Sequence, residues 1–454
     1  MIYDLVIIGG GPAGYLAAER AGHAGLSTLL IEKRFVGGVC LNEGCIPSKA
    51  LLYSAKLSDL AKHGAKYGVT AENVRIDHET VVKRKNKVVQ TLVSGVKSKL
   101  KQNQVVLVNG TAEIMGKTEY GFEVKVSDNI HTGKRLLIAT GSVPVVPPIP
   151  GLAEGIANGF VVTNREILDL NEVPTSLAII GGGVIGLEMA SYFNSAGSQV
   201  IVIEMLDKIA GATDREIAEI LMKKYQKKGV GFRLDAKVTE ITNGAVIYEN
   251  AGQTFAVQAD KVLLSIGRKP ATEGVGLENI GVLTERGRIV TDERGKTNIA
   301  EVYAAGDVNG QSMLAHTAYR EAEVCINTIL GKKDNMRYQA IPSVIYTNPE
   351  VASVGETEET ARQKGIEYEA AKLSMRYSGR FLAENEGEDG ICKVLIDKKH
   401  RNILGVHMIG NYASEIIYGA GLMIETEMRV KDIQELVFPH PTVSEIIRET
   451  IFEF

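Results

Sequence analysis

Two cysteines lie five residues apart near the start of the chain. They are Cys40 and Cys45, in the segment Cys-Leu-Asn-Glu-Gly-Cys. Residues five apart in a regular α-helix are separated by about 7.5 Å along the axis, too far for a disulfide, so a bridge needs a break in the helix. Gly44 and Pro47 can supply that break, and the expected helix over residues 48–60 places the thiols at a helix N-terminus, which lowers a thiol pKa. We predict a redox disulfide; the alternatives are two unrelated buried thiols or a metal site, although no further Cys or His lies close by to complete one.

A histidine near the end of the chain has the chemistry that disulfide exchange needs. His440 lies in the segment Pro-His-Pro-Thr, and Glu445 follows five residues later. A neutral imidazole can take a thiol proton near pH 7, and a carboxylate partner would orient the ring and raise its basicity. A single histidine can equally be structural, and spacing alone does not show that His440 meets the cysteines.

Two glycine-rich turns have the spacing of dinucleotide-binding sites. Each follows a short β-rich run, opens a helix and has a glutamate 23 residues after its first glycine; the residues are Gly9, Gly11, Gly14 and Glu32 in the first copy and Gly181, Gly183, Gly186 and Glu204 in the second. The glycines let a pyrophosphate approach the helix N-terminus, and the glutamate can accept a hydrogen bond from a ribose hydroxyl. One such motif is weak evidence, because glycine turns occur wherever a helix packs closely on a strand. Two matched copies predict two nucleotide sites.

The second of these sites is expected to bind NAD rather than NADP. The carboxylate of Glu204 would repel a 2′-phosphate and suits a free 2′-hydroxyl. No Arg or Lys follows Glu204 until Lys208, which also favours NAD.

The two glycine turns belong to an internal duplication. Residues 5–32 align without gaps on residues 177–204, and 12 of the 28 aligned positions are identical. Each copy has the pattern of a strand, a glycine turn, a helix and a second strand. The duplication predicts an α/β fold with two Rossmann-like dinucleotide-binding domains.

Composition excludes several classes of protein. The 454 residues are 44% hydrophobic and 23% charged with a net charge of −4, which disfavours nucleic-acid and polybasic membrane-surface binding. No apolar run approaches the roughly 18 residues of a membrane span, and the opening MIYDLVIIGGG lacks the features of a signal peptide. Four cysteines are too few for a disulfide framework in so long a chain, so a cytoplasmic location is expected.

Domain boundaries are expected where proline interrupts the pattern. Residues 143–151 hold four of the twelve prolines, and neither a helix nor a central strand continues through such a segment. We predict a first domain at residues 1–145 that is completed by residues 269–335. A second dinucleotide-binding domain is expected at residues 146–268, and an α+β domain at residues 336–454.

Together these residues resemble the pyridine nucleotide-disulfide oxidoreductases, flavoproteins of the glutathione reductase class, over essentially the whole chain. Within that class the chain is most similar to enzymes that reoxidise dihydrolipoyl groups. The similar segments are CLNEGCIPSKALL at residues 40–52, MLAH at 313–316, PSVIYTNPEVASVG at 342–355 and HPTVSE at 440–445.

The resemblance implies an FAD domain with the first glycine turn, an NAD domain with the second, and a C-terminal dimerisation domain. It also implies further site residues beside the two cofactors. For FAD these are Lys49 near the isoalloxazine, Asp307 on the ribityl chain, and Ala112, Gly141 and Ala315; for NAD they are Val238 and Gly267; and Glu188 is implied to pair with Lys49 beside the flavin.

The reaction and the partners are implied by the same resemblance. His440, from the other subunit of an obligate homodimer, would deprotonate a dihydrolipoyl thiol, whose thiolate attacks Cys40 and releases Cys45 beside the flavin. Electrons would then pass to FAD and on to NAD. The implied partner is a lipoyl-bearing protein or domain of a 2-oxoacid dehydrogenase, acetoin dehydrogenase or glycine cleavage system, with no nucleic acid, membrane or metal ion.

Some residues depart from this class or separate the chain from its neighbours in it. Glu43 stands where relatives usually carry an apolar residue, so its charge either raises the thiol pKa values or faces solvent, and Phe438 stands where such enzymes often have His. Val184 and Glu204 differ from the Tyr and the basic residue of glutathione-type reductases, and the C-terminal cysteine pair of mercuric reductases is missing. A structural flavoprotein or an oxidase without a disulfide remains the alternative, and the cysteines with His440 argue against it.

Overall fold

The computed structural model describes all 454 residues, which form two compact units. The first comprises Met1–Ala50, Val82–Val145 and Gly267–Arg337, and the second comprises Leu51–Val81, Val146–Ile266 and Tyr338–Phe454. The residue boundaries predicted for three domains stay predictions. None of the helices combines the length and the hydropathy that crossing a bilayer requires.

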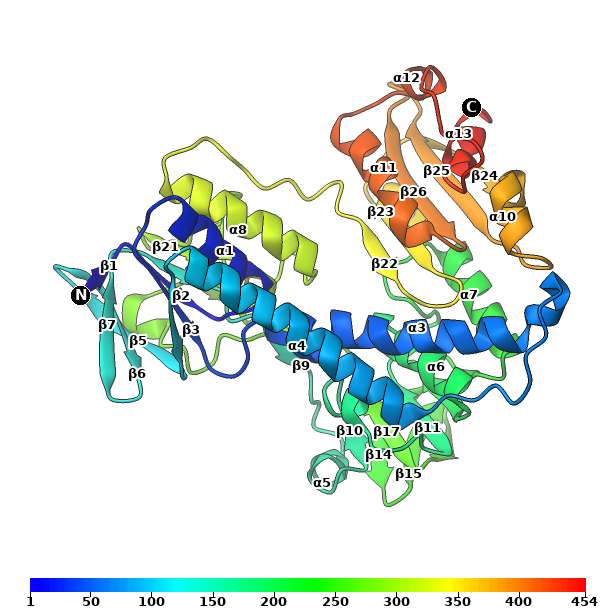
Figure 1. Ribbon diagram of the computed structural model, residues 1–454, viewed down its shortest axis with the longest axis horizontal. Coiled ribbons are helices and arrows are strands. Elements are labelled where there is room, and N and C mark those ends of the chain that lie inside the picture. The colour runs from blue at the N-terminus through cyan, green and yellow to red at the C-terminus, as the bar shows by residue number, and fades with distance from the viewer. The chain divides into compact units, whose positions relative to one another are not determined.

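A parallel five-stranded sheet forms the centre of the first unit, with strand order β21-β8-β2-β3-β4. The strands are β2 (Leu5–Ile8), β3 (Thr28–Glu32), β4 (Val106–Asn109), β8 (Leu136–Ile138) and β21 (Val302–Ala304). Helices α1 (Pro12–His23) and α8 (Ala315–Ile329) lie side by side on one face (Figure 1). Leu5 and Ile7 of β2 pack with these helices, whereas Val6 and Ile8 pack on the opposite face, so both faces are buried.

The opposite face of this sheet is covered by antiparallel strands. These are β5 (Ala112–Thr118), β6 (Gly121–Val126) and β7 (Asn129–Gly133), and β1 (Ile2–Tyr3) pairs with β7 in parallel at the edge. Shorter elements complete the unit: β9 (Ser142–Pro144) pairs with β18 (Arg268–Pro270), and β19 (Thr284–Glu285) with β20 (Arg288–Ile289), beside the 3₁₀ turns η3 (Glu278–Ile280) and η4 (Asp307–Asn309).

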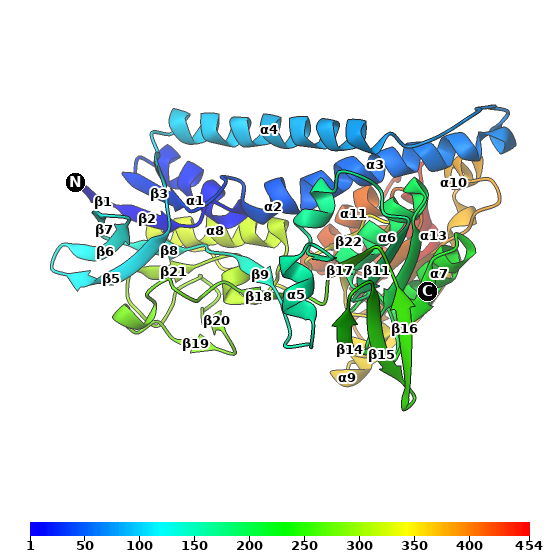
Figure 2. The same cartoon turned by 90° about the horizontal axis from the view of Figure 1, so that it is seen from below.

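The second unit repeats this arrangement with the strand order β10-β17-β11-β12-β13. Its parallel strands are β10 (Val161–Val162), β11 (Ser176–Ile180), β12 (Gln199–Ile203), β13 (Gly231–Arg233) and β17 (Lys261–Leu264). Helices α6 (Val184–Ala196) and α7 (Arg215–Lys227) pack on one face. An antiparallel sheet of β14 (Lys237–Thr242), β15 (Ala245–Asn250) and β16 (Gln253–Gln258) packs on the other (Figure 2). The equivalent strand order confirms the fold that the duplication predicts.

The C-terminal part of the second unit is an antiparallel sheet with helices, in agreement with the predicted α+β fold. The strand order is β22-β23-β26-β25-β24, and the strands are β22 (Ser343–Ile345), β23 (Val351–Gly355), β24 (Tyr368–Ser374), β25 (Ile391–Asp397) and β26 (Ile403–Ile409). The helices are α9 (Glu358–Gln363), α10 (Gly379–Glu384), α11 (Ala413–Glu425), α12 (Val430–Gln434) and α13 (Glu445–Ile451), with η5 (Met375–Tyr377). Helices α11 and α13 bury apolar side chains against this sheet.

The remaining helices include those that carry the cysteines. They are α2 (Gly38–Glu43), α3 (Cys45–Lys62), α4 (His78–Gln102) and α5 (Leu152–Ala157), with η1 (Gly64–Tyr67) and η2 (Glu166–Asp169). The helix predicted over residues 48–60 is therefore longer at both ends and begins at Cys45 itself. Its first residues Cys45, Ile46 and Pro47 need no intrahelical partner for their amides, so proline fits there.

Candidate functional site

The two cysteines lie on either side of a helix break, as predicted. Helix α2 ends at Glu43, Gly44 has φ −153° and ψ −108°, and α3 begins at Cys45. The Gly44 carbonyl accepts a hydrogen bond from the Ser48 amide, so Gly44 starts the new helix while it ends the old one. The break brings the Cys40 and Cys45 thiols within hydrogen-bonding distance of each other, without a disulfide bond between them.

The thiol pair has the electrostatics of a dithiol that can be oxidised reversibly. The hydrogen bond to Cys45, burial and the proximity of a charge on Cys45 raise the pKa of Cys40, and the Lys49 ammonium opposes them. Two adjacent thiols cannot both ionise easily, so Lys49 favours a single thiolate shared by the pair. Lys49 lies one turn after Cys45 in α3, and its ammonium lowers the pKa of the Cys40 thiol.

Glu43 and Phe438, the two departures from the class, both have structural partners. The Glu43 carboxylate lies 3.0 Å from the guanidinium of Arg34, and its side chain is only 12% exposed. The low exposure contradicts the alternative in which Glu43 faces solvent, and its effect on the thiol pKa values stays a prediction. Phe438 packs against the apolar cluster of the C-terminal sheet, which accounts for an aromatic side chain at that position.

The first glycine turn fits closely around the start of α1. Gly9 has φ +106°, and a Cβ there would lie 2.2 Å from the Ala139 carbonyl oxygen. A Cβ at Gly14 would lie 1.7 Å from the Gly9 carbonyl oxygen, whereas at Gly11 it would meet only the Gly38 Cα, at 3.9 Å. Gly9 and Gly14 therefore allow the helix to pack on the strand, and Gly11 leaves the helix start open. No side chain caps α1, so its amides can bind a pyrophosphate.

The second glycine turn repeats this geometry. Gly181 has φ +102°, and a Cβ on Gly186 would lie 2.2 Å from the Gly181 carbonyl oxygen. No protein atom lies within 4 Å of a Cβ on Gly183, and no side chain caps α6. The residues present therefore fit a second dinucleotide in the same way as the first.

Both predicted ribose-binding glutamates bind the amide of the middle glycine in their turn. Glu32 Oε2 accepts from Gly10 N at 2.7 Å, and Glu204 Oε2 accepts from Gly182 N at 2.7 Å. Their second oxygens accept from the amides of Arg34 at 2.7 Å and Leu206 at 2.9 Å. Each carboxylate is thus held at the end of its strand, beside the open start of the helix.

Asp307 lies in a hydrogen-bonded group whose other members the sequence did not indicate. Its Oδ2 accepts from Ser142 Oγ at 2.5 Å, and the Ser142 hydroxyl accepts from Arg268 Nε at 2.7 Å. Ser142 and Arg268 directly follow Gly141 and Gly267, the glycines that end the two matching segments LIATG and LLSIG. The equivalent position after the two matching segments was the signal by which the sequence could have indicated Ser142 and Arg268. These two residues orient Asp307.

The other residues implied for the flavin side lie at a helix start, in a strand and in a turn. Ala315 begins α8, whose start has no side-chain cap, so backbone amides are available there. Ala112 is buried at the start of β5, and Gly141 has φ +73° with no atom within 4 Å of a Cβ. The backbone at Ala315 and Gly141 is therefore accessible to a ligand, whereas Ala112 packs in the core.

His440 and Glu445 form the pair that their spacing suggested. His440 Nδ1 lies 2.8 Å from Glu445 Oε1, and the Thr442 amide donates to Glu445 Oε2 at 2.8 Å. The hydrogen bond from the Thr442 amide lowers the pKa of Glu445 by more than burial raises it, and the hydrogen bond with His440 lowers it further. The Glu445 carboxylate therefore remains charged at neutral pH. The His440 side chain is 77% exposed, and with the Glu445 carboxylate on Nδ1, Nε2 is the ring nitrogen that remains to accept a proton.

The remaining implied residues lie in the second nucleotide fold and at its boundary. Glu188 is 4% exposed in α6, and its Oε1 accepts from the Tyr346 amide at 3.1 Å. Val238 lies in β14 next to an irregularity in the strand pairing, and Gly267 has φ +126° with no atom within 4 Å of a Cβ. The implied pairing of Glu188 with Lys49 stays a prediction.

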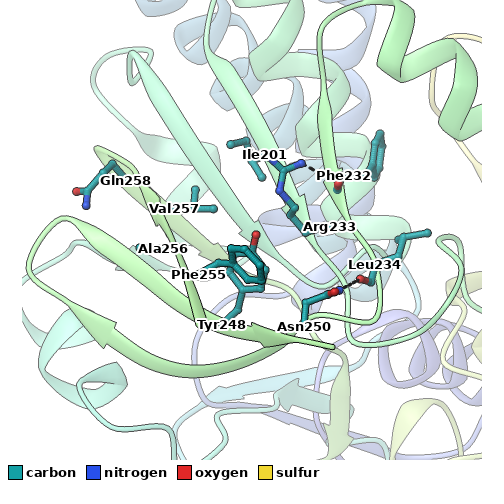
Figure 3. A pocket seen from close by; sticks show the side chains of 10 residues that line it. All are labelled: Ile201, Phe232, Arg233, Leu234, Tyr248, Asn250, Phe255, Ala256, Val257 and Gln258. Atoms are coloured by element: carbon teal, nitrogen blue, oxygen red, sulfur yellow. Dashed lines mark hydrogen bonds between the residues drawn. The ribbon is translucent and has the colours of Figure 1, made fainter. Parts of the chain in front are cut away.

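A cavity of about 670 Å³ in the second nucleotide fold lies apart from these residues. It is lined by β12, β13, β15 and β16, and the Tyr248 and Phe255 rings stack beside it with centroids 5.5 Å apart (Figure 3). None of the predicted site residues lines this cavity. The glycine turn, rather than the cavity, carries the features of a nucleotide site.

Comparison with known proteins identifies the family. Residues 3–322 match the model for pyridine nucleotide-disulphide oxidoreductases, and residues 341–451 match the dimerisation domain of that family. The chain is 40% identical to dihydrolipoyl dehydrogenase of Mycoplasma pneumoniae, over 99% of this chain and 98% of that protein. It is also 40% identical to mitochondrial dihydrolipoyl dehydrogenase of Pisum sativum, over 98% and 90%. The HOCl-induced flavoprotein disulfide reductase RclA of Escherichia coli superposes with a TM-score of 0.87 at 28% identity, over 100% of this chain and 99% of that one.

The chain therefore belongs to the pyridine nucleotide-disulphide oxidoreductase family. Membership confirms the predicted class of enzyme, the cofactors FAD and NAD, and Cys40–Cys45 as the redox centre. It also confirms the predicted α/β fold with a C-terminal dimerisation domain.

Proposed function

We propose that this protein is a dihydrolipoyl dehydrogenase, which oxidises the dihydrolipoyl group of a lipoyl-bearing protein and reduces NAD. The observation that carries the proposal is the Cys40–Cys45 dithiol at the start of α3, with Lys49 one turn away. The dithiol occurs in one chain with two glycine turns that each fit a dinucleotide. Two relatives that match along the full chain at 40% identity are dihydrolipoyl dehydrogenases.

In the proposed reaction, the substrate dithiol reduces the Cys40–Cys45 disulfide by two thiol exchanges. His440 Nε2 takes the proton of one substrate thiol, and the resulting thiolate attacks Cys40, forming a mixed disulfide and expelling Cys45 as a thiolate. The second substrate thiol then attacks the substrate sulfur of the mixed disulfide and closes the lipoyl ring. Cys40 leaves as a thiolate and takes the proton of the attacking thiol. Two electrons and two protons are then held by Cys40, Cys45 and His440.

When bound, FAD would supply the redox chemistry that links the reduced dithiol to hydride transfer to NAD. The chain's own residues would hold the two cofactors. Gly9, Gly11, Gly14 and Glu32, with Ala112, Gly141, Asp307 and Ala315, are proposed for FAD, and Gly181, Gly183, Gly186 and Glu204, with Val238 and Gly267, for NAD. Ser142 and Arg268 would keep the Asp307 carboxylate oriented.

The proposed assembly is a cytoplasmic homodimer in which each subunit's His440 serves the partner's disulfide. Support comes from the dimerisation domain and from the high exposure of the His440 ring, which leaves it available to another subunit. The partner in catalysis would be a lipoyl domain of a 2-oxoacid dehydrogenase, acetoin dehydrogenase or glycine cleavage system. No nucleic-acid or membrane partner is proposed, because the net charge is −4.

Steady-state oxidation of dihydrolipoamide by the FAD-loaded protein tests the proposal. We expect rapid NADH formation, little NADPH formation, and loss of turnover in Cys45→Ser. Cys392→Ala is the matched control, because Cys392 is buried in β25 of the C-terminal sheet and should not affect turnover. A flavin-loaded protein with a reducible disulfide and no turnover would refute dihydrolipoyl groups as the substrate and leave the family intact.

Co-expression of two inactive variants tests the role of the homodimer. If His440 acts on the partner's disulfide, a mixture of Cys45→Ser and His440→Gln subunits restores about one quarter of the activity, since half of the dimers are mixed and each has one complete site. If His440 acts within its own subunit, mixed dimers have no complete site and activity stays absent, which would contradict the shared site.

A further inference from the structure

Two tyrosine hydroxyls are hydrogen-bonded to each other where α1 packs against α8. Tyr15 comes from the first turn of α1, and Tyr319 from the second turn of α8. The ring centroids are 5.9 Å apart with an interplanar angle of 63°, and the two helices lie side by side (Figure 1). The pair therefore joins two helices that are both proposed to bind FAD at their starts.

This tyrosine pair shares an apolar cluster with the redox segment and lies within electrostatic range of its sulfurs. Tyr15 and Tyr319 belong to the same apolar cluster as Leu41 and Ile46, which directly follow the two cysteines in the chain. Burial, and for Tyr15 the bond to Tyr319, raise the pKa of both tyrosines, and negative charge at Cys40 and Cys45 raises it further. Both hydroxyls therefore keep their protons at neutral pH. Since electrostatic interaction is reciprocal, their O–H dipoles act on a charge at either sulfur.

A count of protons shows that the pair has one donor left over. The two hydroxyls carry two protons, and one of these lies in the hydrogen bond between the two oxygens. Neither hydroxyl has another hydrogen-bond partner in the chain. Tyr15 is 8% exposed, and an unused donor in such surroundings costs free energy unless a partner forms at some stage of the cycle.

We propose that the Tyr15–Tyr319 pair supplies a hydrogen-bond donor to the thiolate of the reduced Cys40–Cys45 pair and so stabilises the reduced, ionised redox centre. The first hydroxyl donates to the second, and the second donates to sulfur, directly or through one water. The bond between the hydroxyls polarises the outward O–H, which makes it a stronger donor than a single tyrosine. This inference uses the redox role of Cys40 and Cys45 and does not depend on which disulfide the enzyme reduces.

The test measures thiolate formation in the FAD-loaded protein without any substrate. The protein is reduced with dithiothreitol, freed of it under nitrogen, and alkylated with iodoacetamide at a series of pH values, with mass spectrometry reporting Cys40 and Cys45 separately. A hydrogen bond to an anion shifts its pKa by about one unit. The double variant Tyr15→Phe/Tyr319→Phe should therefore show an apparent thiolate pKa about one unit higher and, at acidic pH, alkylation about tenfold slower.

Tyr303→Phe is the matched control, because Tyr303 is buried in the same apolar cluster but is not bonded to either member of the pair. Its alkylation profile should overlay that of the parent protein. A double variant that binds flavin and has an unchanged or lower thiolate pKa would overturn the proposal. If the double variant does not fold, at least one single variant must show the rise, because one of the two hydroxyls is the outward donor; two unchanged single variants would overturn it equally.

Discussion

Lys393 is a buried lysine in β25 that is surrounded by carboxylates from other elements of the second unit. Its side chain is 5% exposed, and its ammonium lies 3.0 Å from oxygens of Asp214, Glu216 and Glu358. Asp214 is 1% exposed and also caps α7, where its carboxylate accepts from the amides of Glu216 and Ile217. Replacing Lys393 by methionine would preserve most of the buried volume. It would remove the ammonium that Asp214 binds and leave Glu216 and Glu358 with the more exposed cations Lys372 and Arg362.

The expected loss of stability depends on the burial of each partner. Removing one member of a buried ion pair costs about 3–5 kcal/mol. Because Glu216 and Glu358 are 35% and 25% exposed, water offsets part of the loss, so we expect Lys393→Met to lower the free energy of unfolding by about 3 kcal/mol. Lys372→Met is the matched control: Lys372 is opposite Lys393 on β24 and binds the same Glu216 at 2.5 Å, but is 56% exposed. It should cost at most about 1 kcal/mol.

The pH dependence separates lost charge pairing from lost packing. Burial would raise the pKa values of Glu216 and Glu358, but the hydrogen bonds and charge of the lysines outweigh it and hold both below the ordinary value. A lowered carboxyl pKa gives stability that is present above the unfolded pKa and is lost as the pH falls through the folded pKa. The deficit of Lys393→Met should therefore be largest at neutral pH and shrink towards about pH 4. Urea unfolding at several pH values measures it, and a deficit that is equal at all of them would refute this reasoning.

The other predictions concern the cofactor turns and the histidine pair. Gly186→Ala should destabilise the second nucleotide fold, because its Cβ would lie 2.2 Å from a carbonyl oxygen, whereas Gly183→Ala should keep the fold and weaken NAD binding about tenfold. Thermal unfolding measures the first effect and NADH titration the second. Equal effects of the two variants would contradict the assigned roles. Glu204→Ala should raise kcat/KM for NADP relative to NAD about tenfold, and an unchanged ratio would show that this carboxylate does not select the cofactor. Glu445→Gln should lower turnover about tenfold at pH 7 with flavin content unchanged, because His440 loses the carboxylate that orients it. Since the pKa of Glu445 is lowered, the parent enzyme should show no loss of activity from this carboxylate until below about pH 4, and an earlier acidic limb abolished in the variant would argue against it.

The features that the sequence predicted correctly are those defined over short stretches of chain. The glycine turns depend on backbone conformation and on contacts within one strand–turn–helix unit, and the break between Cys40 and Cys45 depends on Gly44. The pairing of His440 with Glu445 needs only the short segment between them, because α13 begins at Glu445. In each case the residue type and the spacing restrict the local geometry to few possibilities.

Contacts between distant parts of the chain were not predictable in the same way. Tyr15 and Tyr319 are 304 residues apart, and Lys393 and Asp214 are 179 apart. Each side chain alone is ordinary for its element, and only the packing of helices and sheets brings the partners together. The ion pair of Glu43 was also not predictable from the neighbouring residues, because it depends on where the loop after β3 places Arg34.

The duplication shows how one arrangement can serve two different cofactors. In both copies the glutamate holds the turn because each of its carboxylate oxygens accepts one hydrogen bond from a backbone amide. A carboxylate oxygen can accept two hydrogen bonds, so each glutamate can still bind a ribose hydroxyl without releasing its turn. The copies differ in the residues that come directly after the glutamate. In the first, Arg34 joins the loop to Glu43 and so to the redox segment, whereas in the second the exposed side chains of Met205 and Leu206 carry no charge. The shared glutamates thus explain why both folds suit a dinucleotide, and the residues after them explain why only the first is joined to the redox segment by an ion pair.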